Sequence, residues 1–79
     1  MTPEWTFGDR VRKARRVKGW AQAELAEALS EQLGHTVSAK AVAAWETDQN
    51  KPTDVVDVAQ RLEEITGIPA TWFVGLDQS

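Results

Sequence analysis

Apolar side chains along this chain recur three and four positions apart, which is the spacing of one face of an α-helix. We find no convincing β-strand, which would show a sustained alternation of apolar and polar residues. The helical stripes consist of Phe7, Val11 and Ala14, then Leu25, Ala26, Leu29 and Leu33, then Val42 and Trp45, and finally Val55, Val58, Ala59, Leu62 and Ile65. The pattern predicts an all-α fold in which these stripes share one core.

Residues that favour helix ends stand at the edges of these stripes. Thr6 and Ser38 are typical N-cap residues, and a glycine follows three of the stripes, where it can adopt the left-handed conformation that ends a helix. Pro69 suits the first turn of a further short helix. We therefore expect one domain over residues 1–79, a compact bundle of about five helices. The predicted helices span residues 6–18, 22–33, 39–46, 54–66 and 69–74.

Cysteine and histidine, which many catalytic and metal sites need, are nearly missing. The chain has no cysteine, so no Cys/His site can form, and its only histidine, His35, lies in a Gly-His-Thr stretch typical of a solvated loop. Carboxylates are plentiful, but none has a sequence neighbourhood that suggests a Ser/His/Asp set or acid–base chemistry. We expect no enzyme activity, no metal, no cofactor and no small-molecule ligand. No apolar run approaches the ~18 residues that span a bilayer, and the N-terminus lacks a signal-peptide pattern. We therefore expect a cytoplasmic protein with no membrane partner.

Charge is distributed unevenly along the chain. The net charge is −3, yet residues 10–18, RVRKARRVK, carry six basic side chains. From Glu46 onward, seven acidic residues stand against Lys51 and Arg61 alone. The total charge disfavours a polyanionic partner, whereas the basic segment provides one face that suits such a partner.

Four short motifs lie along the chain in a fixed order: FGDRVRKAR at residues 7–15, QAELA at 22–26, WETDQNKP at 45–52 and TGIPATWFVG at 66–75. Each motif alone is unspecific. In this order, the set resembles the helix-turn-helix domain of the lambda repressor and Cro type, the XRE-like family of bacterial and phage regulators. The resemblance covers residues 7–76 and implies a lambda repressor-like helical domain.

The resemblance implies a role for the third predicted helix, residues 39–46. In this family that helix enters the DNA major groove with its first turns, while groups around it hold the phosphates. It therefore implies a sequence-specific regulator of transcription, a repressor of phage or bacterial type, that binds double-stranded DNA. The implied groove contacts are Ser38, Ala39, Lys40, Ala43 and Ala44. The implied phosphate contacts are Gln22, Arg16, Lys18, Thr47, Gln49, Asn50 and Lys51, whereas Arg10, Arg12 and Lys13 stay open between phosphate contacts and solvated surface.

The outward face of this helix is unusually poor in hydrogen-bonding groups. Lys40 can donate to the O6 and N7 acceptors of guanine, and an alanine methyl group can touch the methyl group of thymine. The remaining positions, which include Ala41, offer little else. We therefore expect modest base readout, with much of the affinity supplied by phosphate contacts and DNA shape.

Two further contacts follow from the resemblance and touch no base. Arg15 and Glu46 stand at positions that pair in the family as a structural salt bridge between the first helix and the end of the third. Family members usually dimerise through their C-terminal helices, which implies a homodimer here. The candidate dimer surface is Trp72, Phe73, Val74 and Leu76.

The chain departs from the family pattern at three places. Asp48 stands where a glycine is usual, and Ala21 stands where a serine or threonine N-cap is usual. Leu25 and Val37 are also twelve positions apart, a longer separation than in the compact form of the family. The fold tolerates the longer segment at little cost, but the sequence does not fix the angle between the second and third helices.

A second hypothesis comes from a different functional class. The acidic balance and the alanine-rich face of the third helix also suit close packing against another protein. On this alternative the chain is a helix-turn-helix-derived protein-interaction module, such as an antirepressor or an antitoxin-like partner, that binds DNA weakly or not at all.

Overall fold

A computed structural model describes residues 5–75, and within this range it contains only helices and connecting loops. The helices are α1 (Phe7–Lys18), α2 (Gln22–Leu33), α3 (Ala39–Glu46), α4 (Val55–Thr66) and α5 (Ala70–Phe73). The predicted all-α fold of five helices is confirmed. Thr6 is the N-cap of α1, as predicted. The helices α4 and α5 begin one residue later than predicted, because Asp54 and Pro69 occupy N-cap positions, and α5 ends one residue earlier, at Phe73. None of the described helices has the length and apolarity needed to cross a bilayer.

The helix ends are held by local hydrogen bonds. Thr6 and Asp9 form a capping box, in which the Thr6 hydroxyl oxygen accepts from the Asp9 N–H at 3.1 Å and the Asp9 carboxylate accepts from the Thr6 N–H at 3.1 Å. The Ser38 hydroxyl accepts from the Ala41 N–H at 3.0 Å. Each of these caps satisfies donors that the first turn of a helix leaves unpaired. The starts of α1 and α3 are therefore fixed by the sequence next to them.

The predicted apolar stripes meet in one core. The buried apolar residues are Val11, Ala14, Leu25, Ala26, Leu29, Val42, Trp45, Val58, Ala59, Leu62 and Phe73. All but Phe73 belong to the stripes read from the sequence. Phe73 was predicted to be part of a dimer surface, and that prediction is wrong because its side chain is only 1% exposed. The short helix α5 packs against α4 and α1, which turns Phe73 into the core.

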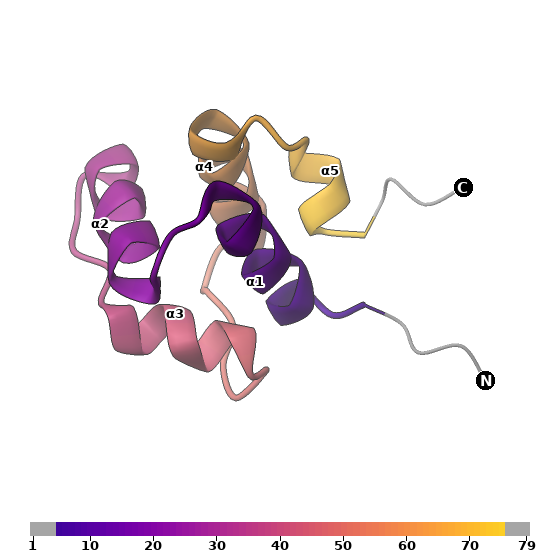
Figure 1. The fold of residues 1–79 in the computed structure, drawn as a ribbon, viewed down its shortest axis with the longest axis horizontal. Coiled ribbons are helices and arrows are strands. Elements are labelled where there is room, and N and C mark those ends of the chain that lie inside the picture. The colour runs from indigo at the N-terminus through magenta and orange to yellow at the C-terminus, as the bar shows by residue number, and fades with distance from the viewer. Residues whose placement is uncertain (1–4, 76–79) are drawn as a thin grey trace.

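The helices are arranged so that α3 lies along one edge of the bundle. Figure 1 shows α3 below α2 and α1, with α4 behind α1 and α5 on the far side from α2. The packing contacts agree with this view, because α3 packs against both α2 and α1, whereas α4 packs against α2 and α5. One side of α3 is thus supported by two helices, and the opposite side faces solvent.

The helix α5 is anchored by Arg10, which the sequence left open between a phosphate contact and solvated surface. Arg10 is only 6% exposed, so it is neither a phosphate contact nor a solvated side chain. Its Nη1 donates to the Trp72 carbonyl oxygen at 2.8 Å, and its guanidinium lies 5.2 Å from the centroid of the Trp72 ring. Trp72 in turn meets Phe73 edge-to-face at 5.2 Å. Arg10 therefore holds α5 against α1 through hydrogen-bond and cation–π contacts.

Candidate nucleic-acid interface

The candidate interface is the side of α3 that points away from α1 and α2. Lys40, Ala43, Ala44 and Thr47 are spaced as one helical stripe, and we call them the α3 outer face. Lys40 and Thr47 are exposed, and the two alanines are half-buried. The opposite side carries the buried residues Val42, Trp45 and Glu46, as the sequence predicted for the first two.

Two small residues of α3 lie differently from what the sequence suggested. Ala41 was placed on the outward side, but it is half-buried and packs against the core. Ala39 is also half-buried, and its position in the helix places it between the outer face and the packed side. Lys40 is therefore the one long side chain on the exposed part of the helix, while Ser38 caps the helix start.

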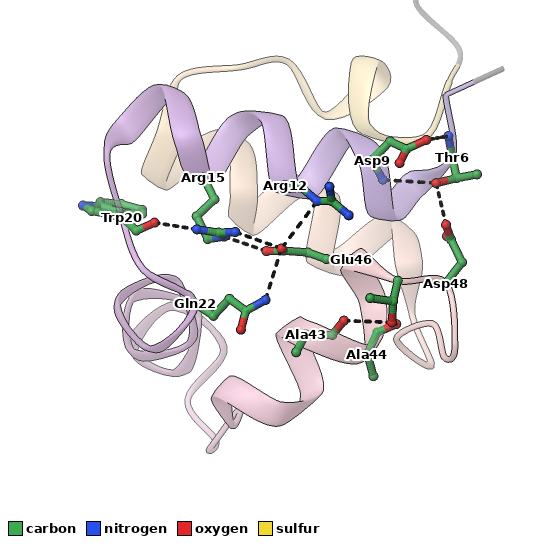
Figure 2. Close-up of polar contacts among 11 residues, drawn as sticks. Thr6, Asp9, Arg12, Arg15, Trp20, Gln22, Ala43, Ala44, Glu46 and Asp48 are labelled. Atoms are coloured by element: carbon green, nitrogen blue, oxygen red, sulfur yellow. Dashed lines mark hydrogen bonds and ion pairs between the residues drawn. The ribbon is translucent and has the colours of Figure 1, made fainter. Parts of the chain in front are cut away.

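A carboxylate at the end of α3 joins this helix to two others. The Glu46 side chain is 2% exposed, and Figure 2 shows Arg12, Arg15 and Gln22 pointing toward it. Arg15 makes a bidentate pair, with its Nε 2.7 Å and its Nη2 3.0 Å from the two carboxylate oxygens. The Gln22 amide nitrogen donates to Glu46 at 3.3 Å. The predicted ion pair between Arg15 and Glu46 is thus confirmed, within a larger group that we call the Glu46 cluster (Arg12, Arg15, Gln22 and Glu46).

The Glu46 cluster fixes where α3 sits. Arg15 also donates through Nη1 to the Trp20 carbonyl oxygen at 2.8 Å, so one guanidinium ties α1 to α3 and to the connection before α2. The hydrogen bond to Glu46 raises the pKa of Arg15 above its ordinary value, against the opposing effect of burial. Such a buried ion pair adds little net stability, because both charges lose hydration, but it fixes the relative position of the two helices that it joins. The cluster therefore sets the orientation of the α3 outer face.

Arg12 was left open by the sequence, and the structure places it beside this cluster. Its Nε is 4.0 Å from a Glu46 carboxylate oxygen, and its side chain is 42% exposed. Arg12 stands three positions before Arg15, so both side chains lie on the same face of α1. This spacing could have predicted from the sequence that Arg12 and Arg15 contact the same residue, Glu46. Arg12 is thus a cation that lies at the rim of the cluster and remains open to solvent.

Gln22, a predicted phosphate contact, is the first residue of α2 and is half-buried. Its side chain is partly engaged by Glu46, as described above. The residue before it, Ala21, offers no side-chain cap, but the Glu24 carboxylate accepts from the Ala21 N–H at 2.7 Å. Half of a capping box is therefore kept, and the loss expected from alanine at this position is partly offset.

The loop after α3, residues 47–51, is exposed along its whole length. The N–H groups of Gln49 and Asn50 both donate to the Ala44 carbonyl oxygen, at 3.0 and 3.4 Å, and the Thr47 hydroxyl donates to the Ala43 carbonyl oxygen at 3.1 Å. These bonds fold the loop back onto the end of α3. The backbone of Gln49 and Asn50 is therefore held at the end of α3, whereas Asn50 and Lys51 line a pocket together with Ala41 and Trp45, away from the α3 outer face.

The loop after α3 turns at Asp48, whose backbone is in the left-handed conformation. Its φ is 61°, and it is the one residue other than glycine with a positive φ in the part of the chain that the structure describes. Aspartate tolerates the left-handed conformation better than most residues, which explains how it replaces the glycine expected here. Its carboxylate also accepts from the Thr6 hydroxyl at 2.8 Å, as Figure 2 shows. The loop after α3 is thereby tied to the start of α1.

The longer separation between Leu25 and Val37 is taken up mainly by helix. The helix α2 continues to Leu33, and residues 34–38 then lead into α3. The Ser30 hydroxyl, on the last turns of α2, accepts from the Val37 N–H at 2.7 Å. This bond holds the connection against α2. The extra residues therefore form an ordered link between the two helices.

The two remaining predicted phosphate contacts, Arg16 and Lys18, are exposed and lie on α1. The Lys18 ammonium is 5.5 Å from the centroid of the Trp20 ring. Arg16 lines a groove on the outer face of α1 with Lys13 and Trp5. The structure thus gathers the other predicted contacts around α3 and its following loop, whereas these two cations belong to α1.

Comparison with protein-family models, with curated proteins and with solved structures returns no match for this chain. The inference of function therefore rests on the sequence motifs and on the geometry of α3 and its surroundings.

Proposed function

We propose that this protein is a sequence-specific DNA-binding regulator of transcription that inserts α3 into the major groove. The observation that carries the proposal is the α3 outer face itself: an exposed lysine among small residues, on a helix whose other side is fixed by the core and the Glu46 cluster. A helix that reads DNA must be both accessible and rigidly oriented. The motif order over residues 7–76 supports the same proposal, and a repressor of phage or bacterial type fits it best.

In the proposed complex, the residues have different tasks. Lys40 donates to guanine acceptors in the groove, and Ala43 and Ala44 let the backbone of α3 approach thymine methyl groups closely. Ser38 and Ala39 meet the groove at the start of α3. Phosphates are held by Gln22 at the start of α2, by Arg16 and Lys18 on α1, and by the loop residues Thr47, Gln49, Asn50 and Lys51. Recognition then depends on few base contacts and on many contacts to the backbone.

A homodimer would supply the affinity that a single small module lacks. Trp72 and Val74 are half-buried and remain candidates for such a surface. Phe73 is excluded by its burial, and Leu76 lies outside the residues that the structure describes. A two-fold dimer would bind two half-sites about one helical turn of DNA apart.

The proposal is tested by selecting binding sites from a random DNA library and titrating the selected site by fluorescence anisotropy at several salt concentrations. We expect one enriched sequence, and binding to it that Lys40→Ala weakens. A control variant, Val56→Ala, changes an exposed side chain of α4 and should leave binding intact. The absence of any enriched sequence and of binding at low salt would reject the proposal.

The alternative is a protein-interaction module built on the same fold. It is favoured by one observation, the half-buried alanines of the α3 outer face, which would let a partner helix pack closely. On this alternative, DNA binding is absent at low salt, and Ala43→Glu abolishes the binding of a partner identified from cells. On the DNA proposal, Ala43→Glu instead weakens binding of the selected DNA, because it places a carboxylate near phosphates.

A further inference from the structure

A groove of about 380 Å³ runs along the outer face of α1, away from the core. Its lining residues are Trp5, Asp9, Arg12, Lys13, Arg16 and Val17. Those on the helix recur three and four positions apart, so they form one stripe over about two turns of α1. The groove is separate from the α3 outer face, since none of its lining residues lies on α3 or on the loop that follows it.

The groove has exposed apolar side chains at its two ends. Trp5 is 51% exposed and Val17 is 64% exposed, and among residues 5–75 the only other large apolar side chain this exposed is Val56 on α4. Single exposed apolar side chains are common on protein surfaces, but these two flank one groove, so an occupant that fills the groove covers both. Val56 lies outside the groove, which makes it a matched control for the tests below.

Trp5 is held in position by an aromatic contact. Its ring meets the Trp72 ring edge-to-face, with centroids 6.2 Å apart and an interplanar angle of 65°. Trp72 is itself fixed by Arg10, whose guanidinium lies over the ring. The indole that forms one end of the groove is therefore preorganised, which lowers the entropic cost of binding a partner there.

The groove is positively charged in a chain whose net charge is −3. Three of its lining residues are the cations Arg12, Lys13 and Arg16, against the single carboxylate of Asp9. That carboxylate already accepts a hydrogen bond from the Thr6 N–H. Lys13 and Arg16 are exposed, and no ion pair joins either of them to another described residue. The groove therefore offers cations for an acidic partner.

We propose that this groove is a docking site for an acidic amphipathic helix of a partner protein. The apolar side chains of that helix lie between Trp5 and Val17, and its carboxylates pair with Lys13 and Arg16. Nucleic acid is the weaker candidate, because a sugar-phosphate backbone supplies anions but no apolar face to cover Val17. A partner helix supplies both. Docking there leaves α3 and the loop after it free and shares only Arg16 with the proposed DNA contacts, so a bound partner takes away one phosphate contact.

The experiment uses a labelled synthetic peptide of leucine and glutamate at helical spacing, titrated against the full chain by fluorescence anisotropy. We expect saturable binding that weakens as salt is added, with NMR chemical-shift changes confined to α1 and Trp5. Val17→Asp should weaken binding about tenfold or more, because it places a carboxylate against the apolar side of the peptide. Lys13→Glu should weaken binding about threefold or more, because it replaces an attractive charge by a repulsive one at an exposed position. Both sites are exposed, so the fold should survive, which circular dichroism verifies.

Two controls make the result decisive. Val56→Asp places the same charge on a similarly exposed valine outside the groove and should leave peptide affinity unchanged. A scrambled peptide of equal composition should bind at least about tenfold more weakly, because it lacks one apolar face. Equal binding of the scrambled peptide, or full binding by Val17→Asp, would overturn the proposal.

Two further outcomes would assign the groove to another occupant and so also overturn it. If Lys13→Glu weakens binding of the selected DNA but not of the peptide, the groove is a nucleic-acid contact. If the chain alone self-associates in sedimentation velocity and Val17→Asp abolishes this, the groove binds a second copy, whose acidic α2 residues Glu24, Glu27 and Glu31 are exposed. Lys40→Ala should leave peptide binding intact, so the failure of the DNA proposal is distinguishable from the failure of this one.

Discussion

Gly8 and Trp45 bring α1 and α3 into direct backbone contact. A β-carbon built on Gly8 would lie 2.1 Å from the Trp45 carbonyl oxygen and 3.0 Å from the Asp48 carboxylate. The first of these neighbours is backbone and cannot turn aside. Any larger residue at position 8 must therefore push the two helices apart, and it must do so next to the Glu46 cluster.

We predict that Gly8→Ala destabilises the fold by roughly 2 kcal/mol or more, as overpacking of a closely packed contact does. Helix propensity predicts the opposite sign, because alanine in a helix is favoured over glycine by about 1 kcal/mol. Urea unfolding followed by circular dichroism measures the difference. A variant as stable as the parent would show that the two helices are not in contact at this point.

The Glu46 cluster leads to a second prediction. Replacing Glu46 with alanine leaves Arg15 largely buried without its carboxylate, and we expect a loss of about 3–5 kcal/mol. Arg12→Ala is the matched control, since Arg12 is 4.0 Å from Glu46 and 42% exposed, and it should cost about 1 kcal/mol or less.

The double variant Arg15→Met with Glu46→Leu removes both charges together. Its cost in unfolding free energy should be well below the sum of the two single replacements, because neither charge is then left alone. Additive losses in this cycle would mean that the two residues do not interact.

The sequence predicted the features that depend on local spacing. The apolar stripes of α2 and α4, which contain Leu29 and Leu62, consist of residues three and four positions apart, so helical periodicity was sufficient to find them. The pairing of Arg15 with Glu46 spans 31 positions, and it was accessible only through the resemblance of the motifs to a known family.

Features created by packing between distant segments could not be read in the same way. Arg10 looked like another member of a basic run, and its burial arises only because α5 returns to cover α1. Phe73 lies on a helix of four residues, too short for a periodic stripe to show which side faces the core. The groove beside Trp5 likewise depends on Trp72, which lies far away in the sequence.

Asp48 is the subject of a third prediction. Its left-handed backbone costs an ordinary residue about 1–2 kcal/mol, while its carboxylate accepts from the Thr6 hydroxyl. Alanine adopts the left-handed conformation less readily than aspartate and cannot accept the hydrogen bond from Thr6. We therefore expect Asp48→Ala to lower the free energy of unfolding by about 1–2 kcal/mol. Asp48→Gly loses the hydrogen bond but relieves the backbone, and it should remain within about 0.5 kcal/mol of the parent.

Thermal unfolding of the two Asp48 variants, beside Gln49→Ala in the same loop, measures these differences. Gln49 is exposed, and its replacement should change stability little. If alanine and glycine at position 48 prove equally stable, the backbone there does not adopt the left-handed conformation.

The proposed function predicts that two lysines near α3 affect DNA binding in different ways. Lys40→Ala removes the base-reading donor, so the selected site should lose about 1–3 kcal/mol of discrimination against a site altered at one guanine, while the salt dependence changes little. Lys51→Ala should weaken selected and altered sites alike and reduce the slope of log affinity against log salt by about 1, because it removes one cation that neutralises a phosphate. Titrations of both sites at four salt concentrations separate these effects. Should Lys40→Ala weaken every site equally and lower the slope, Lys40 contacts phosphate and α3 reads no base through it.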